Sequence, residues 1–339
     1  MTPTIQSLET SGVPFVLYRL PKASVVNGYY QQDMETHRIS LSKAQGFVFA
    51  PFTPEQEVLY IPNRFAFDIK DIPSPVASSK QVKLPLDGKA EVVEKVVNAK
   101  NEIAQGNFEK LVVSHRFQVP HQGNAYEIFN RLIHQYSNAF VYYWSHPQTG
   151  KWMGATPERL LEYDGKSMET MALAGTLAAD MPDKAWSEKE FHEQQLVTNS
   201  IVQALSRKFD SSKIVIGPRE IVRAGNLKHL QTRVCVNTSE LALEDIVFAL
   251  HPTPAVGGIP IGPSAEYIRK NEGYNRSFYT GFMGPIHKEK AQLFINLRCA
   301  HVTNNTIELF AGAGITANST PEKEWDEICR KAQTFFDGV

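Results

Sequence analysis

The stretch from residue 306 to residue 331, TIELFAGAGITANSTPEKEWDEICRK, constrains the fold of this chain more than any other. Its β-rich start, its glycines and its later charged residues predict a strand, a glycine turn and then a helix that begins near Pro321. Helical spacing puts Glu324, Glu327 and Lys331 on one stripe at i, i+3 and i+7. The neighbouring stripe is apolar and consists of Trp325, Ile328, Ala332 and Phe335. Two carboxylates and an ammonium therefore border a buried face, which fits both a solvated helix surface and a functional site.

Length, charge and cysteine content exclude several classes of protein. A chain of 339 residues with 42% hydrophobic and 21% charged residues is typical of a globular protein, and a net charge of −1 predicts no basic surface for nucleic acid. No apolar run approaches the ~20 residues that cross a bilayer, and the first residues do not resemble a leader peptide. The cysteines, Cys235, Cys299 and Cys329, lack the spacing of a zinc site or a disulfide framework. We therefore expect a cytoplasmic protein with reduced cysteines and with neither a membrane nor a nucleic-acid partner.

The remaining patterns predict strands and helices in alternation. Short apolar runs between turns predict β-hairpins over the first 86 residues, and a loop rich in proline and serine at 74–86 marks a boundary. We divide the chain there into a β-rich portion, residues 1–86, that completes a sheet rather than folding alone, and a main portion, residues 87–339. Predicted helices of the main portion are 90–105, 124–136, 187–208 and 265–271, and predicted strands are 110–117, 139–145, 151–155, 160–163, 167–173, 213–216, 279–286 and 292–300. The short connections between successive strands favour antiparallel pairing.

Two charged residues lie on segments that should be buried. Lys110 stands at the entrance of an apolar strand, and Glu193 extends the buried stripe of the helix at 187–208. A lysine that reaches water along its stem and a glutamate at a wet helix end are the alternatives. Together with Glu158 in a turn and the two glutamates of the last helix, these residues suit acid–base chemistry and a hard divalent ion such as Mg²⁺.

Glycine-rich segments add candidate backbone sites. The run GAGITA at 312–317 matches G-x-G-x-x-A, but a dinucleotide fingerprint opens a helix inside a βαβ unit, which this stretch does not predict. The glycines instead let backbone N–H groups approach an anion such as a carboxylate, or they only turn the chain. The run HPTPAVGGIP at 251–260 is too rich in proline and glycine for a regular element and predicts a fixed loop in a pocket wall.

Taken together, these motifs resemble the chorismate-utilising enzymes, the family of isochorismate, anthranilate, aminodeoxychorismate and salicylate synthases. The matching motifs, in the family's order, are EKLVVSHR around Lys110, GATPERLL at 154–161, ALAGT at 172–176, HEQQLV around Glu193, HPTPAVGGIP at 251–260, YTGFMG from Tyr279, LRCA at 297–300 and LFAGAGITANSTPEKEWDE at 309–327. The resemblance implies an α+β fold, in which large antiparallel β-sheets pack at the centre, helices lie outside and the active site lies in the cleft between two halves.

The resemblance also implies a role for each matched residue. Glu193 and Glu327 match Mg²⁺ ligands, and Glu324 matches a glutamate that reaches the ion directly or through water. Lys110 matches the lysine that activates water, and Glu158 matches the acid across the substrate ring. The positions that match substrate-binding residues are Gly175, Thr176, Ala255, Tyr279, Arg298, Gly312, Gly314 and Lys331.

Two residues favour water over ammonia as the nucleophile. Anthranilate synthases usually lack the lysine that matches Lys110, and the aminating enzymes tend to carry threonine where this chain has Ala255. We therefore expect an Mg²⁺-dependent isochorismate synthase, an isomerase that acts on chorismate as a monomer, without an organic cofactor or a glutamine amidotransferase partner. A salicylate synthase, which goes on to eliminate pyruvate, is the first alternative. An ammonia-using synthase component and a catalytically silent binding subunit are the others, and the pathway served, to menaquinone, siderophores or salicylate, stays open.

Overall fold

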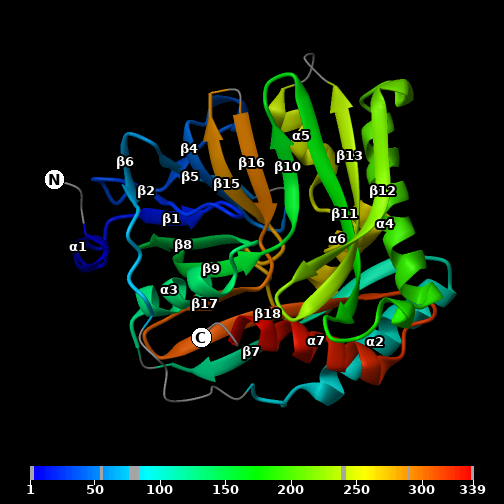
Figure 1. Cartoon of the computed structure of the whole chain (residues 1–339). Helices are drawn as coiled ribbons and strands as arrows, with labels where there is room; N and C mark the ends of the chain where they lie inside the picture. The colour runs from blue at the N-terminus through cyan, green and yellow to red at the C-terminus, as the bar shows by residue number, and fades with distance from the viewer. Residues whose placement is uncertain are drawn as a thin grey trace.

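The computed structural model describes residues 4–53, 56–75, 84–121, 123–237, 242–288 and 290–336. Two nine-stranded sheets, whose neighbouring strands pair antiparallel, pack together at the centre of the molecule. Helices lie outside them, and the strands of one sheet run across those of the other in the view of Figure 1. This arrangement confirms the predicted α+β fold with large antiparallel sheets at the centre.

The strand order shows how distant segments become neighbours. The first sheet runs β14 (Gly258–Ile259), β7 (Lys110–Pro120), β18 (Thr306–Ile315), β17 (Cys299–Val302), β9 (Gly150–Thr156), β8 (Phe140–His146), β1 (Phe15–Arg19), β2 (Val26–Tyr30) and β6 (Phe65–Ile69). The second sheet runs β12 (Ile214–Ala224), β13 (Leu227–Asn237), β11 (Ser167–Ala178), β10 (Arg159–Tyr163), β16 (Lys290–Ile295), β15 (Phe282–His287), β4 (Gly46–Ala50), β5 (Leu59–Pro62) and β3 (His37–Arg38). The N-terminal strands thus lie at one end of each sheet. Most of the predicted loop at 74–86 lies outside the described residues, and the boundary near residue 86 stays a prediction.

Helices cover the outer face of each sheet. In chain order they are α1 (Ile5–Ser11), α2 (Lys89–Ala104), α3 (Ala125–Gln135), α4 (Glu188–Ser206), α5 (Leu243–Leu250), α6 (Ile261–Asn271) and α7 (Pro321–Phe336), with short 3₁₀ helices at Leu41–Lys43, Asp183–Ala185 and Ser211–Lys213. Helix α7 packs on β18 and on α2, whereas α4 packs on β11 and β13. The capping box at the start of α4 is formed by Ser187 and Glu190.

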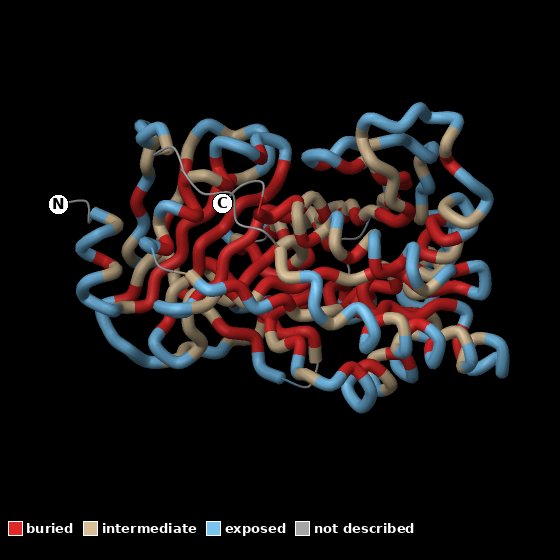
Figure 2. The backbone as a smooth tube through the Cα atoms, turned by 90° about the horizontal axis from the view of Figure 1, so that it is seen from below, coloured by how far each residue is buried: buried red, intermediate tan, exposed pale blue. Residues whose placement is uncertain are grey.

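Successive side chains of one strand point to opposite faces of the sheet and pack into two different layers of the core. Phe140, Tyr142 and Trp144 of β8 point toward the second sheet and join the aromatic cluster between the sheets. The residues between them, Val141 and Tyr143, belong to the cluster beneath the helices that cover the first sheet. This period of two is what a strand buried on both faces requires. The buried strands accordingly fill the middle of the molecule, with exposed segments at its margin (Figure 2).

The chain crosses between the sheets twice at one place. From β9 in the first sheet it passes through Glu158 to β10 in the second, and from β16 in the second it passes through Arg298 to β17 in the first. Two backbone hydrogen bonds join these crossovers, from the Ile295 N–H to the Glu158 carbonyl (3.0 Å) and from the Ala155 N–H to the Arg298 carbonyl (3.2 Å). Arg298 adopts a φ of 47°, the left-handed conformation that the sharp change of direction requires.

Several predicted elements differ from the structure. Gly312 and Gly314 lie within β18, paired with Ser114 and Val112 of β7, so the predicted glycine turn is wrong, and the strand ends only at Ile315. The small side chains do not end the strand because its long neighbour β7 continues to pair with it. The strand predicted at 279–286 begins only at Phe282 and runs to His287 as β15, and the strand predicted at 292–300 runs from Lys290 to Ile295 as β16. Helices α1 and α5 and most of the hairpin β12–β13 were not predicted.

Candidate active site

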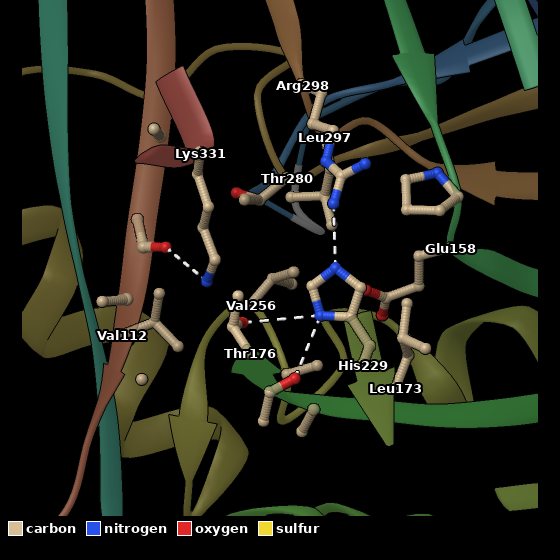
Figure 3. Close-up of a pocket in the computed structure, with 18 of the residues that line it drawn as sticks. Val112, Glu158, Leu173, Thr176, His229, Val256, Thr280, Leu297, Arg298 and Lys331 are labelled. Carbon is tan, nitrogen blue, oxygen red and sulfur yellow. Dashed lines mark hydrogen bonds between the residues drawn. The ribbon is translucent and has the colours of Figure 1, made fainter. Parts of the chain in front are cut away.

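A cavity between the two sheets collects most of the residues that the sequence singled out (Figure 3). It encloses about 720 Å³ of space free of protein atoms, including its open mouth. Its walls come from β7 and β18 of the first sheet, from β11 and β13 of the second, and from both crossovers. The predicted positions that line it are Glu158, Gly175, Thr176, Glu193, Ala255, Tyr279, Arg298, Gly312, Gly314 and Lys331. Lys110 and Glu327 form ion pairs with lining residues, and Glu324 lies one turn from Glu327 on α7.

Lys110 is buried and faces a carboxylate. It begins β7, its side chain is 1% exposed, and its Nζ lies 3.1 Å from Glu193 Oε1 on α4. Gly314 on the neighbouring strand leaves room for this pair, since a Cβ there would lie 2.2 Å from Glu193 Oε1 and 2.7 Å from Lys110 Cε. The burial excludes a lysine that snorkels to water, and the pair supplies the partner that a buried ammonium needs.

The charged stripe of α7 also faces inward rather than toward water. Lys331 Nζ lies 2.8 Å from Glu327 Oε1 and donates to the carbonyl of Gly312 at 2.9 Å. Glu324 is 1% exposed and forms an ion pair of 2.7 Å with Lys189 of α4. Burial and the charge of Glu327 raise the pKa of Glu324. Burial acts to raise the pKa of Glu327 too, but the Lys331 and Lys189 ammonium groups outweigh it and lower that pKa.

The carboxylates of α4 and α7 supply the type of oxygen ligand that a hard cation such as Mg²⁺ prefers. As placed, no three His, Cys, Asp or Glu side chains in the described ranges approach closely enough to hold a metal ion. Glu324, Glu327 and Glu193 nevertheless all act on one ammonium, because their charges together raise the pKa of Lys189 although its burial acts in the opposite direction. Glu324 Oε2 is buried and has no hydrogen-bond partner among the described atoms. Carboxylate oxygens that include an unsatisfied acceptor are of the kind that a hard cation prefers.

A guanidinium and an imidazole occupy the other side of the cavity. Arg298 Nη2 donates to His229 Nε2 at 2.8 Å, so Nδ1 of that ring carries the proton and donates to the Gly175 carbonyl at 3.0 Å (Figure 3). Thr176 Oγ1 lies 3.4 Å from the same Nδ1. Burial and the neighbouring Arg298 and Lys331 charges lower the pKa of His229 to about 3, which keeps the ring neutral. Burial lowers the pKa of Arg298 to about 10, so the guanidinium stays charged at neutral pH.

Glu158 is the carboxyl group of the cavity with the clearest acid character. It lies in the first crossover, is 4% exposed and points into the cavity beside His229 (Figure 3). Burial raises its pKa to about 7, although the charges of Lys110, Lys331 and Arg298 act to lower it. A carboxyl group that is half protonated near neutral pH can donate a proton to a leaving group.

Aromatic and small residues complete the walls. Tyr279 is 2% exposed and stacks on Phe310, with ring centroids 5.3 Å apart. A Cβ at Gly312 would lie 3.0 Å from the Tyr279 hydroxyl, so the glycine gives that ring its space. Gly175 adopts a φ of 74°, which favours glycine and directs its carbonyl to His229.

Two residues that interact with the predicted site residues were not predicted from the sequence. His229 lies on β13, a strand that was not predicted, and nothing in its local pattern indicates a site. Lys189 did carry a signal, because it precedes Glu193 by four residues on the same helix and therefore shares its face.

Within the described part of the chain, no helix combines the length and apolar character needed to span a membrane. The family described as chorismate binding enzyme matches residues 63–339. The chain is 31% identical over 249 residues to isochorismate synthase MenF of Escherichia coli strain K12, which covers 69% of this chain and 56% of the relative. It is 32% identical over 258 residues to the salicylate biosynthesis isochorismate synthase of Pseudomonas aeruginosa PAO1, and this match covers 72% of this chain and 54% of the relative. The chain thus spans about half the length of these curated relatives.

Among solved structures, the chain resembles that of MenF, the menaquinone-specific isochorismate synthase from Escherichia coli. The TM-score is 0.81 at 20% sequence identity, and the match covers 95% of this chain and 88% of the other. At this identity the similarity establishes a shared fold, with the two packed antiparallel sheets described above.

Proposed function

Because the chain belongs to the chorismate binding enzyme family, we propose that it is an Mg²⁺-dependent isochorismate synthase. The observation that carries the proposal is the presence of two buried groups at one cavity, a carboxyl group that lines it and a lysine whose charge acts on that carboxyl group. Lys110 begins β7 and forms an ion pair with the lining residue Glu193, and Glu158, with its pKa raised to about 7, lines the cavity from the crossover between the sheets. A base and an acid held on different elements can act at two ends of one ring.

In the proposed reaction a hydroxyl group is relocated without redox change. Lys110 acts as the base that takes a proton from water as the water oxygen bonds to C2 of chorismate. The ring double bonds shift, the C4–O bond breaks, and Glu158 delivers a proton to the departing hydroxyl, which leaves as water. One water enters and one leaves, and the product, isochorismate, is an isomer of the substrate.

The remaining cavity residues bind and orient the substrate in this proposal. Arg298 offers two N–H groups to the enolpyruvyl carboxylate, with the neutral His229 fixing its orientation and Tyr279 alongside. Lys331 lies where it can meet the ring carboxylate or balance the acidic residues of α7. Glu193 and Glu327, and Glu324 directly or through water, would hold Mg²⁺, which supplies Lewis-acid attraction for the ring carboxylate.

Two features favour isochorismate as the product. Lys110, which contacts the lining residue Glu193, and Ala255 in the cavity wall support water rather than ammonia as the nucleophile. The named relatives are isochorismate synthases, of menaquinone and of salicylate biosynthesis. A salicylate synthase shares the lysine and stays the second candidate. A silent binding subunit has no need for an acid, a base and clustered carboxylates together. We expect a monomeric cytoplasmic enzyme with no amidotransferase partner.

The test is one product assay. Purified protein with chorismate and Mg²⁺ should form isochorismate, identified by mass spectrometry, at a rate that added ammonium leaves unchanged. Salicylate and pyruvate as the only products, or turnover that requires ammonium, would contradict the proposal. Lys110→Ala should lose water addition while still binding chorismate in the presence of Mg²⁺, as measured by calorimetry. Full turnover by that variant would remove Lys110 from its role.

A further inference from the structure

We propose that Arg276 is a positioning residue that locks three walls of the cavity together, with Glu272 holding its guanidinium in place. The inference rests on the proposed function and adds a residue that does not touch the substrate. Arg276 is 2% exposed and Glu272 4% exposed. Their contact is bidentate, with Nε donating to Glu272 Oε2 at 2.5 Å and Nη2 to Oε1 at 2.6 Å. The planar fork of arginine matches a carboxylate in this geometry, so the guanidinium has one orientation.

The remaining donors of Arg276 reach three segments that are far apart in the sequence. Nη1 donates to the Val256 carbonyl at 2.7 Å and lies 3.4 Å from Thr280 Oγ1. Nη2 donates to the Val112 carbonyl at 3.0 Å. Val112, Val256 and Thr280 all line the cavity and appear around it in Figure 3. One guanidinium therefore ties together β7, the loop at 251–260 and the turn before β15.

The edge of the first sheet explains why this clamp is needed. Strand β14 pairs with β7 only at Lys110 and Leu111, so the following carbonyl, that of Val112, has no strand partner on this side. Arg276 supplies the donor, and Glu272 accepts from the Ser114 N–H at 3.0 Å and from its hydroxyl at 2.5 Å. Side chains after α6 thus take the place of a missing strand, as buried backbone groups require.

Each clamped segment carries a residue of the proposed chemistry. Val112 lies two positions from Lys110 on β7, so the two side chains share a face of the sheet. Val256 follows Ala255, and Thr280 follows Tyr279, whose ring centroid lies 5.6 Å from the Arg276 guanidinium carbon. Thr280 adopts a φ of 62°, a conformation that a β-branched residue holds only when its surroundings fix it.

The anchors of the substrate on the opposite wall are independent of Arg276. Arg298 is held by His229, and Lys331 by Glu327 and the Gly312 carbonyl. Loosening the clamp should therefore displace Lys110 more than it weakens binding. An effect on kcat with little effect on KM distinguishes positioning from a general loss of stability.

Arg276→Lys is the test variant, because lysine keeps the charge beside Glu272 but has no fork to bridge Val112 and Val256. Arg19→Lys is the matched control. Arg19 is 5% exposed and donates to the carbonyls of Ile133 and Tyr136, but it does not line the cavity. Chorismate consumption with Mg²⁺ is measured at a temperature where circular dichroism shows each variant fully folded.

We expect kcat of Arg276→Lys to fall on the order of 100-fold, with KM changed by less than about threefold, and Arg19→Lys to keep its kcat. If Arg276→Lys does not fold, Glu272→Gln carries the test, with kcat about tenfold lower through loss of half the fork. A kcat within about twofold of the wild type for the folded test variant, or an equal loss in Arg19→Lys, overturns the inference alone. No chorismate consumption by the wild type overturns the proposed function, and the inference with it.

Discussion

Gly314→Ala tests whether the space between β18 and the Lys110–Glu193 pair is essential. Gly314 pairs with Val112 in an ordinary strand, and its φ lies outside the left-handed region, so the backbone accepts alanine. The new Cβ would lie 2.2 Å from Glu193 Oε1 and 2.7 Å from Lys110 Cε, whereas ordinary contacts begin at 3.4 Å. Both side chains must therefore withdraw, and the carboxylate oxygen by about 1 Å.

The magnitude follows from which atoms move. The two contacted atoms belong to the ends of flexible side chains, so the overpacking should cost no more than about 1–3 kcal/mol of stability. A misplacement of about 1 Å in a residue of the site lowers a rate by about 100-fold, which corresponds to about 2.7 kcal/mol of activation free energy. We expect kcat/KM for chorismate to fall by about that factor while the protein stays folded.

Steady-state formation of isochorismate, with urea unfolding of the same samples, measures both quantities. Gly262→Ala is the matched control, because a Cβ at Gly262, in α6, meets no atom within 4 Å. Calorimetric titration with Mg²⁺ reports separately on Glu193, whose withdrawn carboxylate should bind the ion less tightly. If kcat/KM of Gly314→Ala lies within about threefold of the wild type, activity does not require the close approach of Gly314 to Lys110 and Glu193.

Four further outcomes follow from the cavity. Glu158 must be protonated to act as the acid and its pKa is about 7, so kcat/KM should fall as pH rises above 7. Glu158→Gln should remove this dependence on alkaline pH and lower activity by up to about 100-fold. A fall above pH 7 that persists in the variant contradicts the assignment. His229→Asn should raise KM for chorismate about tenfold, since Arg298 loses an acceptor, and an unchanged KM would count against the pair. Burial lowers the pKa of His229 to about 3 and that of His251 to about 4, so both rings stabilise the folded state above pH 6.5, and this stabilisation is lost as pH falls. At pH 5 each ring should lower the free energy of unfolding, measured in urea, by about 2 kcal/mol. A His229→Asn, His251→Asn double variant should lose less free energy of unfolding between neutral pH and pH 5 than the wild type. Chelation with EDTA should stop turnover and added Mg²⁺ should restore it, whereas full activity in EDTA would exclude the ion from the reaction.

Local spacing was sufficient to predict parts of the site that one element carries. Glu324, Glu327 and Lys331 share a face of α7 because helical geometry fixes which residues lie together, whatever packs against them. Burial of Glu193 followed in the same way from the apolar stripe of α4. The family motifs supplied the arrangement of the sheets, which local pattern alone does not provide.

The parts that failed depend on which strands pair. A period of two shows that a run is a strand but does not identify its partner, so the crossovers at Glu158 and Arg298 were read as a turn and a strand end. The same limit explains the error at Gly312 and Gly314, where pairing with β7 continues the strand through residues that usually interrupt one. His229 reaches Arg298 only because β13 lies beside β11, a pairing of distant segments.

The charges around the cavity supply a physical reason for a divalent ion in the proposed reaction. Glu193, Glu324 and Glu327 each form an ion pair with a lysine, whereas Arg298 contacts the neutral imidazole of His229. The site therefore carries a small positive excess, with Glu158 largely uncharged below pH 7. In the proposed reaction chorismate would bring two carboxylates into this buried space, more negative charge than that excess offsets, and unbalanced charge in a low dielectric is costly. One Mg²⁺ would reverse the balance, and the carboxylates that suit it lie on α4 and α7 and pair with lysines rather than with Arg298.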